Sequence, residues 1–341
     1  TTGNPKGVLH CFNTTLCTCA TFNRELEMTE FDVMLDYLPV GLNWGYCTLV
    51  QSVMAGAKTI LMERFSGSGA LEMIEREKVT YIPTAPASIV AMLNLPDLKQ
   101  RDLSSLRLVI TGGASAAVET IKAFQAAVPH AKLVELYGML ETGFHSFTRL
   151  SDDPLKVNGT VGRCVDEMGL RILDDDEKDV AYGDVGEIAA IGPSVHLGYL
   201  NNATANRDSF TADGWFKTGD LGQFADADGN VRIAGRKKEI INRGGKKYFP
   251  REIEELLYEH PKIVQAAIVG APDPRLGEKN CLCVITKEGE SLALDEVVSF
   301  LKGRVADYKL PEAIVVMNDF PMTPTGKIRR PELVKRVTGR V

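Results

Sequence analysis

Short β-rich runs alternate with helical segments through the first 150 residues, and two of these runs end directly in glycine. The run at 106–111 leads into Gly112, and the run at 132–137 leads into Gly138. Strands that alternate with helices favour an α/β fold in which helices flank largely parallel sheets. Because ligands bind beyond the carboxyl ends of the strands in such sheets, these two junctions are the first candidates for a site. Further strands are expected at 31–38, 57–62 and 80–83, and a helix is expected at 116–128.

The second half of the chain has a different pattern. Gly and Asp separate short strands from about residue 160 to 233, which is typical of an antiparallel, β-barrel-like subdomain. A charged segment at 236–239 separates this part from a compact α+β unit with expected helices at 250–258 and 294–304. We therefore expect a large domain at 1–235 that includes the barrel-like subdomain at 160–235, a hinge at 236–239, and a small α+β domain at 240–341.

Charge and composition exclude several classes of function. The net charge is −6, but residues 236–341 carry +5 and residues 1–235 carry −11. A basic small domain on an acidic body suggests an anionic ligand between them, although a solvated surface explains the charge as well. The sequence has no polybasic block or aromatic–basic stripe, which argues against nucleic acid as a partner. No run of about 18 apolar residues offers a membrane span. The seven cysteines lack zinc-site spacing and suit a reducing, cytoplasmic environment.

Four segments carry residues suited to binding phosphates, a cation or hydroxyl groups. The opening segment, residues 1–7, combines hydroxyls, glycines and a lysine, but it lacks the spacing of the common NTPase phosphate loop. A Pro- and Gly-containing loop near the C-terminus projects Lys327. Glu141 follows an expected strand and is suited to hold a cation, and Asp220 follows a turn and is suited to two vicinal hydroxyls. Each segment alone also fits an ordinary surface loop.

The joint order of these segments resembles the adenylate-forming superfamily of acyl-CoA synthetases, nonribosomal adenylation domains and luciferases. Six motifs match from residue 1 to about 335. The opening matches only the second half of the family's phosphate loop, which implies that part of the large domain precedes this sequence. We then expect exposed apolar surface where that part packs. The other matching segments are Tyr137–Glu141, Gly186–Tyr199, Gly214–Asp220, residues 235–254 and residues 321–327.

The resemblance implies an enzyme that joins a carboxylic acid to AMP with ATP and Mg²⁺, releases pyrophosphate, and passes the acyl group to a thiol, usually that of coenzyme A. It implies that Lys327 is the catalytic cation and that Glu141 is the Mg²⁺ ligand. Tyr137 should stack on adenine, and Asp220 should accept hydrogen bonds from both ribose hydroxyls with Arg236 nearby. The remaining nucleotide-binding residues implied are Gly113, Ala114, Glu135, Leu136, Gly138 and Thr142 around the ring and the α-phosphate, and Thr1, Thr2, Gly3 and Lys6 at the departing pyrophosphate.

The second step needs a different arrangement, because a lysine and a thiol cannot both occupy the mouth of one site. In the family the small domain acts as a lid that swings about one residue, which is Lys238 here. The swing brings Gly244 and Gly245 to the site, where small residues let the pantetheine arm pass. An ordinary solvated linker lysine at position 238 is the alternative.

Two departures from the family pattern affect the expected site. The family's phosphate-binding Thr is Leu140 here, so Thr142 or a backbone N–H group is expected to replace its hydrogen bond. Asn43 and Trp44 are expected to form the wall of the acyl pocket, although a capping Asn and a core Trp would give the same pattern. Gly138 and Met139 are expected to form its floor. The working hypothesis for the acid is a medium-chain, cyclic or aromatic carboxylate.

An ATP-dependent acid–CoA ligase is the leading interpretation, with a homodimer as a possible assembly. The nearest alternative is an adenylation enzyme that loads the phosphopantetheine thiol of a carrier protein. The sequence contains no carrier-like Gly-Gly-x-Ser segment, which mildly favours coenzyme A. A non-catalytic protein that binds acyl groups or nucleotides is a third alternative, and Leu140 is the motif residue in its favour.

Overall fold

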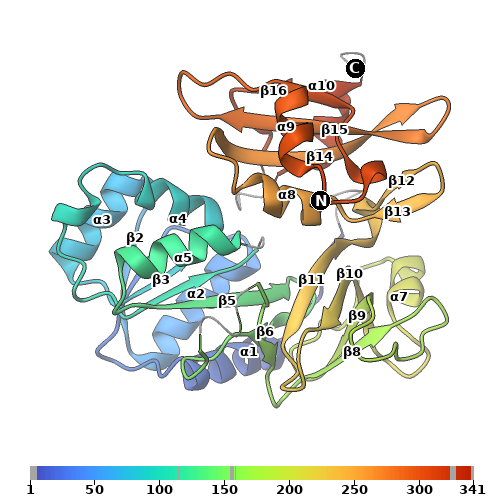
Figure 1. The fold of residues 1–341 in the computed structure, drawn as a ribbon. Helices are drawn as coiled ribbons and strands as arrows, with labels where there is room; N and C mark the ends of the chain where they lie inside the picture. The colour runs from blue at the N-terminus through green and yellow to red at the C-terminus, as the bar shows by residue number, and fades with distance from the viewer. Residues whose placement is uncertain (1–5, 114–115, 154–156, 158, 323–327, 339–341) are drawn as a thin grey trace.

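The computed structural model describes residues 6–113, 116–153, 157, 159–322 and 328–338. Within them, the strands form three sheets (Figure 1). The first has the order β2-β1-β3-β4-β5-β6-β7, with parallel pairing from β2 to β5 and antiparallel pairing from β5 to β7. These strands are β1 (Val33–Asp36), β2 (Lys58–Leu61), β3 (Tyr81–Thr84), β4 (Leu108–Thr111), β5 (Lys132–Met139), β6 (Gly143–Phe147) and β7 (Arg163–Cys164).

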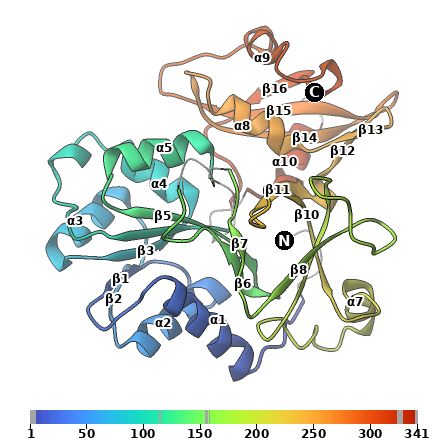
Figure 2. The ribbon, with the colours of Figure 1, turned by 60° about the horizontal axis from the view of Figure 1, so that its bottom comes forward.

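Helices cover both faces of this sheet (Figure 2). Alternate strand residues divide between two cores: Met34 and Tyr81 pack on the side of α1 and α2, whereas Leu35 and Ile82 pack on the side of α3, α4 and α5. This division explains why the strands are apolar at successive positions. The helices are α1 (Phe12–Glu25), α2 (Asn43–Ala55), α3 (Gly67–Glu77), α4 (Pro86–Leu93) and α5 (Val118–Ala127).

The second sheet is antiparallel, with the order β11-β10-β9-β8. It consists of β8 (Gly169–Leu173), β9 (Gly186–Ile191), β10 (Phe216–Phe224) and β11 (Val231–Arg236), and α7 (Ala203–Ser209) lies beside it. Among the described residues β8 and β11 are its edges, so the sheet is open. The α/β class is therefore confirmed, with an antiparallel subdomain that does not close into a barrel.

The small domain begins after β11 and lies above the carboxyl ends of the parallel strands (Figure 1). Its sheet has the order β13-β12-β15-β14, with β16 beside β15, and hydrophobic cores lie on both faces. Cys281 and Cys283 are fully buried in β15, as expected for a core strand. The elements are β12 (Ile241–Arg243), β13 (Lys246–Tyr248), α8 (Pro250–Leu257), β14 (Ile263–Asp273), β15 (Gly277–Thr286), α9 (Leu294–Leu301), β16 (Ala313–Val316) and α10 (Arg330–Val337).

Exposed apolar side chains gather on the outer surfaces of α1 and α2 and on the loop before β1. Phe12, Phe31 and Val53 are each at least 80% exposed. Across the part of the chain that the structure describes, no helix combines the length and the apolar character that a membrane-spanning segment needs.

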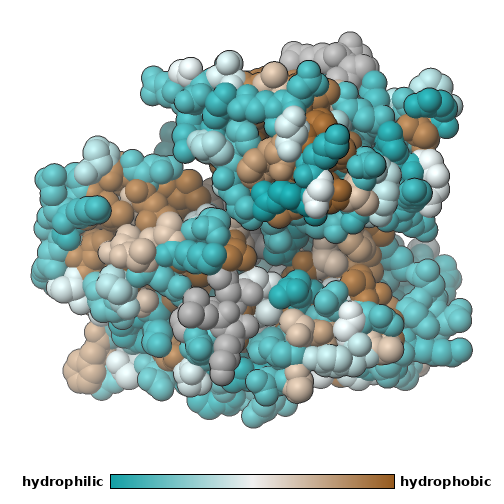
Figure 3. Space-filling view, viewed as in Figure 1, coloured by the Kyte–Doolittle hydropathy of each residue, from teal (hydrophilic) through white to brown (hydrophobic). Residues whose placement is uncertain are grey.

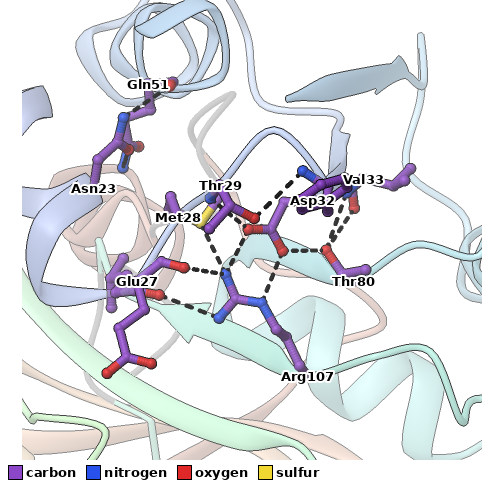
Figure 4. Close-up of polar contacts among 11 residues, drawn as sticks. Asn23, Glu27, Met28, Thr29, Asp32, Val33, Gln51, Thr80 and Arg107 are labelled. Carbon is purple, nitrogen blue, oxygen red and sulfur yellow. Dashed lines mark hydrogen bonds and ion pairs between the residues drawn. The ribbon is translucent and has the colours of Figure 1, made fainter. Parts of the chain in front are cut away.

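A polar network fixes the amino ends of the parallel strands (Figure 4). Asp32, just before β1, accepts two hydrogen bonds from the guanidinium of Arg107, just before β4, at 2.8 and 2.7 Å. It also accepts hydrogen bonds from the Thr80 hydroxyl at 2.6 Å and the Thr29 amide at 2.9 Å. Burial acts to raise the pKa of Asp32, but these hydrogen bonds outweigh it and hold the pKa below its ordinary value.

Replacing Arg107 by Met should destabilise the fold, because it leaves the Asp32 carboxylate buried without its ion-pair partner. We expect a loss of about 3–5 kcal/mol in the free energy of unfolding, measured by urea denaturation at pH 7. The difference in the free energy of unfolding between the parent and this variant should become smaller at low pH, where Asp32 is protonated. The control is Arg76→Met, which removes exposed ion pairs with Glu72 and Glu77 and should cost less than about 1 kcal/mol. Equal losses in the two variants would contradict the role assigned to the network.

Candidate functional site

A cavity of about 330 Å³ lies between the carboxyl ends of the parallel strands and the small domain. Apolar surface lines the recess beside α4 and α5 (Figure 3). The large domain contributes the start of α4, the end of β5, the middle of β10 and the end of β11, and the small domain contributes α8 and the start of α10. The lining residues used below are Gly113, Leu136, Tyr137, Gly138, Asp220, Arg236, Glu239, Arg251, Glu254, Met322, Ile328 and Arg330.

Tyr137, Asp220 and Arg236 meet at the floor of the cavity. Antiparallel pairing of β10 and β11 places Asp220 opposite Arg236, whose Nε lies 3.0 Å from Asp220 Oδ1. The Tyr137 hydroxyl donates a hydrogen bond to Asp220 Oδ2 at 3.0 Å. Burial and the neighbouring Asp220 carboxylate raise the pKa of Tyr137 well above its ordinary value, so the phenol stays protonated. The structure thus brings together three of the residues singled out in the sequence.

His145 supports Tyr137 from behind and was not singled out in the sequence. Its ring packs edge-on against the Tyr137 ring, with centroids 5.0 Å apart and planes at 81°. It is fully buried in β6, and burial lowers its pKa to about 4, so the imidazole is neutral at physiological pH.

Glu141 and Lys6 meet at a second place, on either side of Tyr199. The Tyr199 hydroxyl donates a hydrogen bond to Glu141 Oε1 at 3.0 Å, and Lys6 Nζ lies 4.1 Å from the centroid of the Tyr199 ring. Backbone hydrogen bonds join residues 7–9 to residues 198–200. The Leu9 amide donates to the Gly198 carbonyl at 2.9 Å, and the Leu200 amide donates to the Gly7 carbonyl at 2.8 Å. The sequence motif contained Tyr199, but its contact with Glu141 depends on the long-range approach of residues 196–199 to the β5–β6 turn, where the His196 amide donates to the Glu141 carbonyl at 2.7 Å.

Asn43 and Trp44 form the first turn of α2 and are not among the residues that line the cavity. A Cβ atom at Gly112 would lie 3.1 Å from the Leu136 carbonyl oxygen and 3.3 Å from the Trp44 ring, so glycine permits this close packing. Trp44 Nε1 is buried without a hydrogen-bond partner among the described residues. Asn43 Oδ1 accepts a weak hydrogen bond from the Cys47 thiol at 3.5 Å.

The turn between β5 and β6 contains the departures from the family motif. Leu140 is 43% exposed, whereas Thr142 is fully buried and its hydroxyl donates to the Gly143 carbonyl at 3.3 Å. The Thr142 side chain therefore faces the protein interior. Gly138 is required beside this turn, because a Cβ atom there would lie 2.2 Å from the Gly143 carbonyl oxygen. Met139 follows it and is half-buried.

Glu135 lies on β5, two residues before Tyr137, and is buried. It ends a row of side chains across β3, β4 and β5, in which Thr84 pairs with Thr111 and Thr111 with Glu135. Its Oε1 atom has no hydrogen-bond partner among the described residues. Burial raises the pKa of Glu135 to about 8, although the charge of Arg251 and the Ala116 amide favour the ionised form.

The segment that contains Lys327 and the turn at Gly244 and Gly245 differ in whether their described residues line the cavity. Residues on both sides of the loop at 323–327 line the cavity, and the loop's base is closed by pairing of Met322 with Ile328. Gly244 and Gly245 turn the chain between β12 and β13 with φ angles of +59° and +85°, and they do not line the cavity. Five of the expected site residues lie outside the described residues: Thr1, Thr2, Gly3, Ala114 and Lys327.

Two family models match this chain. The family model described as AMP-binding enzyme matches residues 1–200, and the model described as AMP-binding enzyme C-terminal domain matches residues 252–327. The chain belongs to the AMP-binding enzyme family. The recognition made from the motif order is therefore confirmed.

Two curated relatives of the AMP-binding family match nearly the whole chain. Medium-chain fatty-acid–CoA ligase of Escherichia coli K12 is 34% identical over 99% of this chain and 60% of its own length. Indoleacetate–CoA ligase of Aromatoleum aromaticum is 35% identical over 98% of this chain and 65% of its own length. The chain thus spans about 60–65% of the length of these relatives.

Solved structures of one AMP-binding protein match to different degrees. ATP-bound MatB from Rhodopseudomonas palustris is 28% identical, with a TM-score of 0.93 over 98% of this chain and 66% of that one. Apo MatB from the same organism covers 99% of this chain and 66% of that one at the same identity, but its TM-score is 0.77. The arrangement of the present chain is therefore closer to the ATP-bound structure.

The raised pKa of Glu135 predicts a pH-dependent stability. This carboxyl has a pKa of about 8 in the folded chain and a reference value of 4.5, so its contribution to stability falls as the pH rises from about 4.5 to 8. Replacing Glu135 by Gln removes this loss. We expect that variant to match the parent near pH 4 and to exceed its free energy of unfolding by about 1–3 kcal/mol at pH 8.

Urea denaturation over a pH series measures this difference. The matched control is Glu119→Gln, which alters an exposed carboxylate that pairs with Lys122 and should change stability little at any pH. A stability difference for the Glu135 variant that stays constant from pH 4 to 8 would contradict the assignment.

Proposed function

We propose that this chain is part of an AMP-forming acid–CoA ligase. The proposal is carried by one observation: a single cavity collects Tyr137, Asp220 and Arg236 from the large domain and the base of the Lys327 loop from the small domain. The similarity to two CoA ligases supports it.

In this proposal, the nucleoside of ATP binds at the cavity floor. Asp220 offers a buried carboxylate, held by Arg236 and Tyr137, to the two ribose hydroxyls. The Tyr137 ring provides a flat apolar surface for adenine, with the Gly113 backbone and Leu136 beside it. Glu135 lies behind this surface, and His145 keeps the Tyr137 ring in place.

The phosphates extend toward Glu141 and Lys6. Because Mg²⁺ is commonly held by one or two carboxylates together with substrate phosphates and water, Glu141 fits as its protein ligand, and the ion would neutralise charge on the phosphates. In the described part of the chain, no group of three or more His, Cys, Asp and Glu residues offers an all-protein site. Lys6, with Thr1, Thr2 and Gly3, would bind the departing pyrophosphate, while Thr142 would need to turn outward to reach the α-phosphate.

The first chemical step is attack of a carboxylate oxygen on the α-phosphorus. The new P–O bond forms as the bond to the pyrophosphate oxygen breaks, and negative charge builds on the α-phosphate oxygens. Lys327, in the segment whose flanking residues Met322 and Ile328 line the cavity, would stabilise that charge as a positioned cation. In the second step a thiolate attacks the acyl carbonyl carbon and AMP leaves.

Formation of the thioester requires rearrangement of the small domain. The Gly244–Gly245 turn lies away from the cavity in this arrangement, which corresponds to the first step. Rotation about Lys238 would exchange the Lys327 loop for this turn and open a path for the pantetheine arm.

The proposed acid is a medium-chain, cyclic or aromatic carboxylate. Leu136, Gly138 and Met139 provide an apolar edge beside the α-phosphate position, and Trp44 lies behind Gly112. The names of the two CoA ligases include a medium-chain fatty acid and indoleacetate, which supports this substrate class.

A panel of carboxylic acids tests the function. With the full-length protein, ATP and Mg²⁺, we expect acid-dependent exchange of labelled pyrophosphate into ATP for medium-chain or aromatic acids. We expect thioester formation with coenzyme A. Acylation of a carrier protein but not of coenzyme A would favour the loading function. Absence of exchange with every acid would contradict the proposal.

A lysine substitution separates the two steps. Lys327→Ala should lower acid-dependent pyrophosphate exchange by about 10²–10³-fold, because the developing charge on the α-phosphate loses a positioned cation. Thioester formation from supplied acyl-AMP should remain within about twofold of the parent, since the second step does not use this loop. Lys335→Met, a nearby change outside the loop, is the control. An equal loss of pyrophosphate exchange and of thioester formation would contradict the assignment of Lys327 to the first step alone.

A further inference from the structure

Lys237, which directly precedes the proposed hinge, is fastened to the large domain. Its ammonium lies 3.0 Å from Asp175 Oδ1 and 3.1 Å from Glu187 Oε2. Glu187 belongs to β9 and is mostly buried, and its other oxygen accepts a hydrogen bond from the Gly219 amide at 3.1 Å. The Lys237 side chain is therefore tied to the strand pair that presents Asp220.

Glu239, two residues later, is fastened to the small domain. Its Oε2 lies 3.0 Å from Arg330 Nε. The same guanidinium makes two hydrogen bonds of 2.8 Å to Glu254 on α8 and one of 2.9 Å to the Ile268 carbonyl on β14. Because Arg330 is held on three sides, it fixes Glu239 to the body of the small domain.

The ion pairs of Lys237 with the large domain and of Glu239 with the small domain thus act as two clamps. Lys238 lies between them and has a different environment. It is exposed and makes no ion pair or side-chain hydrogen bond with the described residues. The hydrophobic cores divide at the same place, since Ile233 packs with the antiparallel sheet and Ile241 packs with the small domain. The backbone bonds at Lys238 are thus the ones that neither clamp restrains.

We propose that these clamps confine rotation between the two domains to Lys238, which makes Lys237 and Glu239 positioning residues for both chemical steps. The inference rests on the proposed two-step function. Each additional unrestrained residue in the hinge would add backbone conformations and lower the population of either productive arrangement. A small domain on a longer flexible tether would reach both arrangements less often.

The two clamps differ in exposure, which predicts their relative strength. The Lys237 side chain is 46% exposed, and its partner Asp175 is 94% exposed, so Glu187 provides the stronger contact. Arg330 is 19% exposed and Glu239 is 27% exposed, and Arg330 has several other partners. We therefore expect the Glu239 clamp to be the stronger of the two.

Hydrogen exchange of the hinge, followed by mass spectrometry, tests the clamps directly. In the full-length protein, Glu239→Ala and Lys237→Met should speed amide exchange in residues 237–241 at least threefold, and more for Glu239→Ala. Lys237→Arg keeps the cation and should leave exchange close to that of the parent. The matched controls remove small-domain ion pairs away from the hinge: Glu259→Ala, which loses a contact with Arg304, and Lys262→Met, which loses a contact with Glu296.

The same variants should slow both half-reactions. We expect Glu239→Ala to lower kcat about tenfold, which corresponds to about 1.4 kcal/mol, for pyrophosphate exchange and for thioester formation from acyl-AMP. KM for ATP should stay within twofold, since Glu239, although it lines the cavity, pairs with Arg330 and is not among the groups proposed to hold the nucleotide. Lys237→Met should show a smaller loss in both steps, and the controls should show none.

Different failures have different meanings. Unchanged amide hydrogen exchange at residues 237–241 in the variants of an active protein would overturn the proposed clamps. A loss of kcat confined to one half-reaction would also overturn them, as would an equal loss of kcat in the Glu259 control. Absence of both half-reactions in the parent protein would instead contradict the proposed function, because the exchange measurement needs no turnover.

Discussion

Tyr137 links the mainly parallel sheet to the antiparallel sheet. It lies on β5 of the mainly parallel sheet, but its side chain packs in the core of the antiparallel sheet with Ile172, Ile188 and Val231. Its hydroxyl then meets Asp220, which is aligned by Arg236 on the neighbouring strand. This contact fixes the end of β5, the middle of β10 and the end of β11 relative to one another. A buried phenol between two sheets has little freedom to move, so the cavity floor is formed before any ligand binds.

The small domain completes the cavity from the side opposite this floor. Together with the hinge it is the basic part of the chain, since residues 236–341 carry +5 against −11 for the remainder. A cationic lid above an anionic ligand attracts the ligand from solution and lowers the cost of bringing its charge out of water. Its direct tie to the large domain includes the Arg251 guanidinium, which donates to the Ile233 carbonyl at 2.9 Å. Such a contact is easily exchanged for water, which suits a domain that takes more than one orientation.

The sequence predicted most of the elements because their signals are local. Alternating apolar runs and glycines placed β1 to β5 and α8 within a few residues, and the order of six motifs led to the family. The contacts of Tyr199 and His145 could not be predicted, because each depends on residues brought together by strand pairing. The inward orientation of Thr142 follows from the tight turn into β6, where Gly143 has a φ of +65°. A motif reports which residue types are present, whereas the direction of a side chain is decided by the backbone around it.

Two buried carboxyl groups lie at opposite ends of the parallel sheet. The hydrogen bonding of one suits it to stabilise the fold, and that of the other suits it to bind a ligand. Asp32 at the amino end is 4% exposed and Glu135 at the carboxyl end is 7% exposed, yet their pKa values move in opposite directions. Burial raises both, so the difference lies in the partners: Asp32 has an arginine, a hydroxyl and an amide, whereas one oxygen of Glu135 has none among the described residues. A fully bonded charge holds strands together and has no capacity left for a ligand. A buried group with an open hydrogen-bonding position costs stability, and it is tolerated where a bound molecule can complete its bonding. The carboxyl end of the sheet, where Glu135 lies two residues before Tyr137 on β5, is therefore the end whose structure a ligand would complete.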